Sequence, residues 1–113
     1  MELNDEDIAA AEALVRYMEE AREKLVEAKM LREKAFKVGR MRESMRTDPK
    51  LAPYITISSH IDSSMKVSFS AADFPKMLGD IELAIQLHAD SIQRDAIEML
   101  NPLMPVRGEE PEE

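Results

Sequence analysis

The sequence predicts a mainly α fold of the α+β class, in which two long helices flank a two-stranded antiparallel β-hairpin. Apolar residues alternate with polar ones in residues 54–70, which is the period of a half-buried strand. On both sides of this segment the apolar residues recur at three- and four-residue steps, the spacing of an amphipathic helix. We therefore predict a long N-terminal helix, a hairpin over about 54–69 and a second long helix over about 71–100.

The first helix is expected to begin after Asn4 and to continue to about Arg46. Asn4 is a favourable N-cap, and the acidic residues 5–7 fall in the first turn, where the helix dipole favours negative charge. Leu3 is placed to form a hydrophobic staple with the first turn. Gly39 costs about 1 kcal/mol relative to alanine, so a kink or an end at Gly39 is the alternative.

Small residues repeat along one side of this helix. Ala21, Ala28 and Ala35 occupy alternate positions of a coiled-coil-like seam, and their size would let a neighbouring helix approach closely. Arg32 interrupts the seam, where a charge needs a partner or a ligand.

The hairpin register follows from the two-residue period of a strand. Pairing Ile57 with Val67 and Ile55 with Phe69 places all four apolar side chains on one face and leaves Ile61–Ser63 as a three-residue loop. A lone hairpin is marginally stable, and its open edges invite a second copy of the chain. The hairpin therefore favours a homo-oligomer.

The second helix follows directly from the second strand. Ser70 is placed as its cap, and Phe69 and Phe74 as its hydrophobic staple. Pro75 removes a helical hydrogen bond, so the regular helix is expected to begin nearer Asp73 after a loose first turn. One face of this helix carries Leu78, Ile81, Ile85, His88, Ile92 and Met99.

The two helices differ in length, which bears on assembly. Folded back antiparallel, the second helix covers only the later part of the first and leaves the end with Ile8, Leu14, Val15 and Met18 without a partner. We expect oligomerisation to complete the helical packing. Residues 1–102 are expected to form a single helix–hairpin–helix domain, and 103–113 a disordered acidic tail.

Composition excludes several function classes. The 113 residues contain no cysteine, which excludes disulfides and thiolate chemistry, and no apolar run reaches the length of a membrane span. The sequence also lacks a glycine-rich phosphate loop and the common hydrolase motifs. We expect a cytoplasmic, non-enzymatic protein with no cofactor and no catalytic or metal site. An enzyme using His60, Asp62 and His88 is the least favoured alternative, because His88 reads as a core or interface histidine.

Charge is distributed unevenly along the chain. The net charge is −8, but residues 1–28 contain nine acids and three bases, whereas residues 29–50 contain eight bases and three acids. The basic segment and the hairpin serines together suit a small phosphate-bearing ligand, while the overall charge disfavours a double-stranded nucleic acid. The alternative is that these bases only balance acidic helix faces. The candidate ligand-binding residues are Arg32, Lys37, Arg40, Arg42, Arg46, Ser58, His60 and Ser64.

The order of elements resembles a group of phage proteins. A long charged helix ends at Arg-Thr-Asp-Pro, the strands Tyr-Ile-Thr-Ile-Ser-Ser and Met-Lys-Val-Ser-Phe-Ser follow, and a helix opens with Ala-Asp-Phe-Pro-Lys-Met-Leu. This pattern resembles small uncharacterised bacteriophage accessory proteins of helix, hairpin, helix organisation. The resemblance implies a non-enzymatic oligomer in the host cytoplasm, and some phage proteins of this size and style sequester nucleotide signals of bacterial immunity.

Two functions follow as hypotheses. The first is a homo-oligomeric phage accessory or anti-defence protein, at least a dimer, that sequesters a small anionic, nucleotide-like ligand. The second is a protein-interaction or assembly adaptor that docks another protein, such as a host protein, through its helical face and acidic tail. Neither hypothesis involves a membrane.

Overall fold

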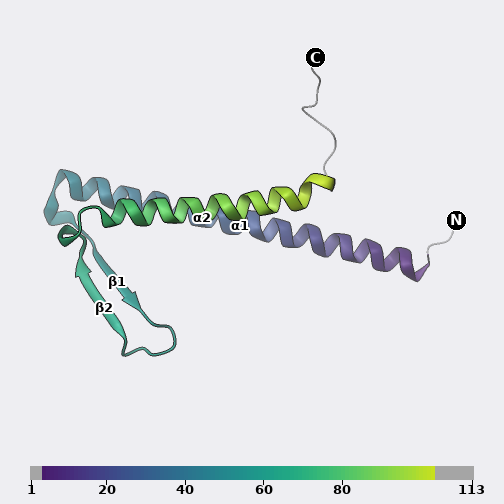
Figure 1. Ribbon diagram of the computed structural model, residues 1–113, viewed down its shortest axis with the longest axis horizontal. Helices are drawn as coiled ribbons and strands as arrows, with labels where there is room; N and C mark the ends of the chain where they lie inside the picture. The colour runs from purple at the N-terminus through teal and green to yellow at the C-terminus, as the bar shows by residue number, and fades with distance from the viewer. Residues whose placement is uncertain (1–3, 104–113) are drawn as a thin grey trace, which may run out of the picture. The chain divides into compact units, whose positions relative to one another are not determined.

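The structure is a computed structural model that describes residues 4–103, and it confirms the predicted order of helix, hairpin and helix (Figure 1). The two helices are α1 (Asp5–Thr47) and α2 (Met77–Leu100), and the strands are β1 (Tyr54–Ser58) and β2 (Lys66–Ser70). Short 3-10 turns connect or follow them, at Pro49–Leu51 (η1), Ala71–Asp73 (η2) and Asn101–Leu103 (η3).

The chain divides into two compact units. The terminal unit comprises Met1–Lys29 and Ala89–Glu113, and the hairpin unit comprises Met30–His88. Of the acidic tail that we predicted for residues 103–113, only Leu103 lies within the described residues, where it ends η3. No helix in residues 4–103 is long and apolar enough to cross a membrane.

The first helix begins and ends as the sequence indicates. The Asn4 side chain accepts a hydrogen bond from the Asp7 N–H at 2.9 Å, which confirms Asn4 as the N-cap, whereas Leu3 of the expected staple lies outside the described residues. The helix runs through Gly39 without a break, so the alternative of an end there is wrong. At the C-terminus the Asp48 carboxylate accepts the Lys50 N–H at 3.0 Å and starts η1.

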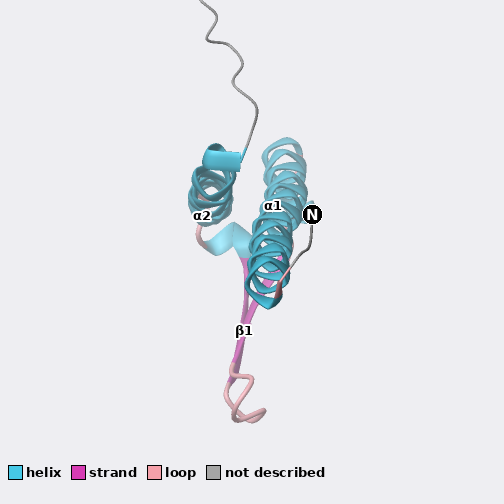
Figure 2. Cartoon of the chain, turned by 90° about the vertical axis from the view of Figure 1, so that its right-hand side faces the viewer, coloured by secondary structure: helices cyan, strands magenta, loops and turns pink. Residues whose placement is uncertain are grey.

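The hairpin has the predicted register. Ile55 pairs with Phe69 and Ile57 pairs with Val67, in an antiparallel two-stranded sheet. Figures 1 and 2 show that, within the hairpin unit, the hairpin leaves the helix ends and projects away from them. As a result Ile57 and Val67 remain 63% and 59% exposed.

The predicted three-residue hairpin loop is wrong. The strands stop at Ser58 and resume at Lys66, so the connection is longer than Ile61–Ser63. The last backbone hydrogen bond of the ladder joins the Ser59 N–H to the Met65 carbonyl, and beyond it Ser59 Oγ accepts the N–H groups of Ile61 and Asp62, both at 3.1 Å. Short polar side chains of this kind compete with strand pairing for backbone donors.

The start of the second helix also differs from the prediction. The Ser70 side chain accepts the Ala72 N–H at 3.1 Å, and the rings of Phe69 and Phe74 pack edge to face at 5.2 Å, so the predicted cap and staple are confirmed. They hold the 3-10 turn η2, however, and α2 begins only at Met77. The residue before a proline avoids helical angles, and Phe74 accordingly has φ −136 and ψ 78.

The buried residues of the two units are alanines, with the exception of Leu78. In the terminal unit they are Ala21, Ala28, Ala89 and Ala96, and in the hairpin unit they are Ala35, Ala71 and Leu78. The predicted alanine seam of the first helix is therefore confirmed as its buried side. Among the described residues no large side chain is fully buried, so close helix approach rather than a bulky core characterises the fold.

His88 departs from its predicted position. We expected His88 on the packing face of α2, but it is exposed, and the neighbouring Ala89 is the buried residue. The interpretation of His88 as a core histidine is wrong. The other residues predicted for this face are buried or partly buried, so His88 alone lies off it, and the small Ala89 takes the buried position where the helices approach closely.

The uncovered end of the first helix is confirmed. Within the terminal unit, α1 extends past the end of α2 in Figure 1, and Ile8, Leu14, Val15 and Met18 are 46%, 45%, 54% and 46% exposed. The fold thus leaves a large apolar surface on α1. Completion of this packing by a second copy stays a prediction.

Candidate functional site

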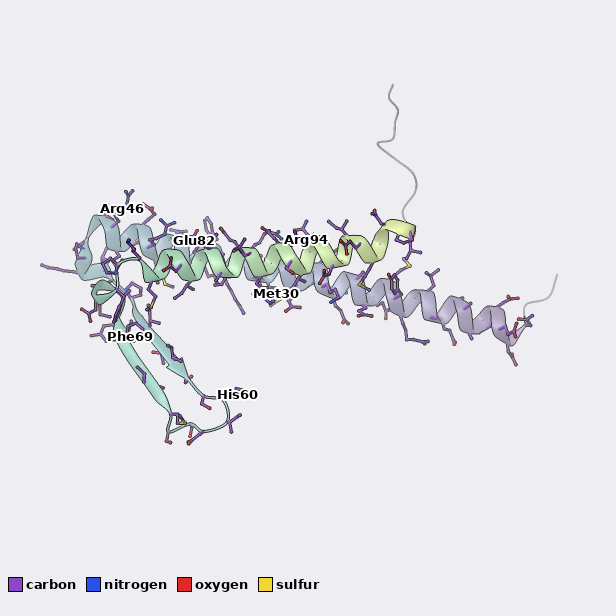
Figure 3. The ribbon with its side chains drawn as sticks, viewed as in Figure 1. Met30, Arg46, His60, Phe69, Glu82 and Arg94 are labelled. Carbon is purple, nitrogen blue, oxygen red and sulfur yellow. The ribbon has the colours of Figure 1, made fainter. Side chains whose placement is uncertain are left out.

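The structure places the eight candidate ligand-binding residues in two groups within the hairpin unit. Arg32, Lys37, Arg40, Arg42 and Arg46 lie on α1, whereas Ser58 ends β1 and His60 and Ser64 lie in the hairpin loop. Figure 3 shows Arg46 near the end of α1 and His60 at the far tip of the hairpin. The basic and the hydroxyl-bearing residues therefore do not converge on one pocket.

Arg42 forms the main polar contact between the helices of the hairpin unit. Its Nε and Nη2 atoms donate to the same carboxylate oxygen, Oε1 of Glu82 on α2, at 3.1 and 2.7 Å. The Arg42 side chain is 39% exposed and that of Glu82 is 19% exposed, so the pair is partly shielded from water. The Arg42 side chain therefore already joins the two helices of the hairpin unit, which is a structural role.

Gly39 makes room for this ion pair. A Cβ atom at position 39 would lie 2.8 Å from Oε2 of Glu82, the oxygen that does not face Arg42. The glycine that weakens the helix in the sequence therefore allows the carboxylate to approach the α1 backbone. Sequence analysis missed Glu82, because the contact spans forty residues and no local pattern signals it.

The last turns of α1 carry a second, more exposed ion pair. Arg46 donates to Glu43 at 3.0 Å, and the Arg46 side chain is 78% exposed. Arg42 also approaches Glu43, at 3.7 Å. Arg42 and Arg46 thus face carboxylates of their own chain, which supports the structural interpretation of part of the basic segment.

Arg40 has a different neighbour. Its guanidinium carbon lies 5.9 Å from the centre of the Phe36 ring, within the range of a cation–π contact. The Phe36 side chain is 64% exposed. An exposed ring beside an arginine is a pairing that can stack a planar base and hold its phosphate, and sequence analysis did not single out Phe36.

The hairpin loop is organised by its own side chains. The Ser64 hydroxyl and N–H donate to Oδ1 of Asp62 at 2.7 and 3.0 Å. Hydrogen bonding from the Ser64 hydroxyl, and then from its N–H, lowers the pKa of Asp62 below its ordinary value of 3.8. Ser64 is therefore engaged by Asp62. In residues 4–103 no group of histidine, aspartate and glutamate is arranged to hold a metal ion.

A groove lies along α1 in the terminal unit. Its lining is mostly apolar, and it lies where the end of α2 meets the side of α1. The sequence signal for it was the uncovered apolar end of the first helix. The lining residues are Val15, Met18, Glu19, Arg22, Leu25 and Leu100.

The chain matches no protein-family model, and comparison with curated proteins and with solved structures finds no match either. The resemblance to phage accessory proteins therefore stays a prediction.

Proposed function

We propose that the protein is a non-enzymatic, homo-oligomeric binding protein that acts as an adaptor for another protein. The observation that carries the proposal is the apolar surface: the residues buried in the described chain are six alanines and Leu78, while larger apolar side chains such as Val15, Met18 and Ile57 are exposed. Exposed apolar surface of this extent marks protein interaction sites.

The groove of the terminal unit is the proposed docking surface for that partner. Val15 and Met18 line it together with Leu25 and Leu100, and the α1 residues 15–25 that span it carry three acids and three bases. An apolar groove of balanced charge fits the apolar face of an amphipathic helix. The partner is therefore expected to contribute such a helix.

Mass spectrometry of cross-linked complexes tests the adaptor. Wild-type protein and a Val15→Asp, Met18→Asp variant are tagged in the native host and compared, with Val26→Asp as the matched control. Val26 is a similarly exposed valine of the same unit, at 43%, and does not line the groove. We expect one partner to cross-link to the groove residues of the wild type and the control but not of the double variant. Equal capture by all three proteins would overturn the proposal.

A small anionic ligand is the second candidate, favoured by the Arg40 and Phe36 pair. A nucleotide would stack on the exposed ring, while Arg40 and the adjacent Lys37 neutralise its phosphate. Isothermal titration calorimetry with a panel of mono- and dinucleotides tests this candidate. Phe36→Ala and Arg40→Glu should each abolish binding, and Arg46→Glu, which leaves the pair intact, should reduce it only slightly. Unchanged binding in Arg40→Glu would exclude this site.

A further inference from the structure

We propose that β1 of one copy pairs antiparallel with β1 of a second copy about a twofold axis at Thr56, which joins two hairpins into one four-stranded sheet. The inference rests on the proposed homo-oligomer and names the surface that forms it. The partner that binds this strand edge is a second copy of the chain.

The backbone of β1 is oriented for this pairing. Ser59 N–H donates to the Met65 carbonyl at 3.0 Å and Ala71 N–H donates to the Pro53 carbonyl at 2.9 Å, so these two pairs are hydrogen-bonded positions of the ladder. Hydrogen-bonded pairs alternate along an antiparallel ladder, so the backbone N–H and C=O groups of Ile55 and Ile57 also point towards β2. The N–H and C=O groups of Tyr54, Thr56 and Ser58 therefore point away from β2, and the sheet of the described residues has no third strand to receive them.

The sequence of β1 is self-complementary about Thr56. A twofold axis there sets Thr56 opposite Thr56 of the second copy and Tyr54 opposite the second copy's Ser58, and these are the residues whose backbone groups point outward. About six backbone hydrogen bonds would form. In the same register Ile55 falls opposite the second copy's Ile57, so the apolar faces of the two hairpins become continuous.

Charge selects the edge of β1 over that of β2. The strand Tyr-Ile-Thr-Ile-Ser carries no charge, whereas β2 begins with Lys66, and a lysine on an edge opposes pairing.

Proline substitution separates the two edges. Thr56→Pro removes an N–H that points outward and places a ring on the proposed interface, while the ladder to β2 keeps its hydrogen bonds. Ser68→Pro is the matched control: Ser68 pairs with Thr56, its N–H points outward on the opposite edge, and either substitution removes the 2.9 Å hydroxyl contact between them. Sedimentation equilibrium should show the self-dissociation constant raised on the order of a hundredfold in Thr56→Pro and little changed in Ser68→Pro.

Cross-linking keeps the proposal testable if a proline variant fails to fold. The chain has no cysteine, so Thr56→Cys and Ser68→Cys each introduce a single thiol at an exposed strand position. A short bis-maleimide should link two copies of Thr56→Cys efficiently and two copies of Ser68→Cys poorly. If the wild type is oligomeric, equal cross-linking of the two cysteine variants would overturn this inference alone. Equal self-dissociation constants of the two proline variants would do the same. A wild type that is monomeric at every concentration would also overturn the proposed oligomer.

Discussion

Arg42 and Glu82 join the two helices of the hairpin unit through a single carboxylate oxygen, which accepts hydrogen bonds from both Nε and Nη2 of the arginine. The contact lies next to Gly39, which is the only glycine of α1. Ion pairing and close backbone approach thus occur at the same point of the fold.

Removal of this pair should destabilise the protein. We expect Glu82→Ala to lower the free energy of unfolding by about 1 kcal/mol, because partial exposure of both side chains reduces the value of a charge-assisted hydrogen bond. Arg46→Ala, which breaks the more exposed pair with Glu43, should change it by less than about 0.5 kcal/mol. Urea titration at one fixed protein concentration measures both. Equal decreases in the free energy of unfolding would show that the Arg42–Glu82 pair stabilises the protein no more than the exposed Arg46–Glu43 pair.

Gly39→Ala should depend on the residue at position 82. Alanine gains about 1 kcal/mol in helix propensity over glycine, but its Cβ would displace the Glu82 carboxylate. We therefore expect little or no gain in the wild type and a gain of about 1 kcal/mol in Glu82→Ala. A double-mutant cycle of urea midpoints measures this coupling. The same gain in both backgrounds would mean that Glu82 moves aside without cost.

Enlarging a buried alanine should be costly. Ala28 is 1% exposed, so Ala28→Leu is expected to lower the free energy of unfolding by about 1–3 kcal/mol through overpacking. Ala13→Leu adds the same atoms at an exposed position of the same unit, and should change it by less than about 0.5 kcal/mol. Thermal unfolding followed by circular dichroism compares the two variants. A tolerated Ala28→Leu would contradict the close approach of the helices.

The hairpin loop should respond to acid through Asp62. Ser64→Ala removes the hydroxyl that is the largest cause of the lowered pKa of Asp62, so this pKa should rise towards 3.8. Because the folded-state pKa is depressed, Asp62 stabilises the loop above its ordinary pKa, and this contribution is lost as the pH falls through the lowered value. Carboxyl 13C NMR titration measures the shift. Ser63→Ala is the control, since the described hydrogen bonds do not join Ser63 to Asp62; an equal shift there would refute the assignment.

Local patterns predicted most of the fold. The hairpin register followed from the two-residue period of Ile55 and Ile57, and the buried seam followed from the repeat of Ala21, Ala28 and Ala35. Each feature depends on the spacing of apolar or small residues within one strand or one helix. The loop length and the start of α2 were wrong, because the side chains of Ser59 and the angles imposed by Pro75 changed the backbone locally.

The candidate site was less predictable for a physical reason. Charge runs in the sequence indicate where cations lie along the chain but not which carboxylates reach them from another helix. Glu82 and the exposed ring of Phe36 decide how Arg42 and Arg40 are engaged, and both depend on side-chain placement in the folded unit. The separation of Arg46 from His60 likewise follows from the direction in which the hairpin projects (Figure 3).

The alternation along β1 divides its amide protons into two classes. Those of Ile55 and Ile57 are held by β2, whereas that of Thr56 points outward. In an isolated copy, amide hydrogen exchange along the strand should therefore alternate between slow and fast from one residue to the next. In a four-stranded sheet Thr56 would become as slow as its neighbours, so the exchange rate of one amide records whether a second hairpin is in place.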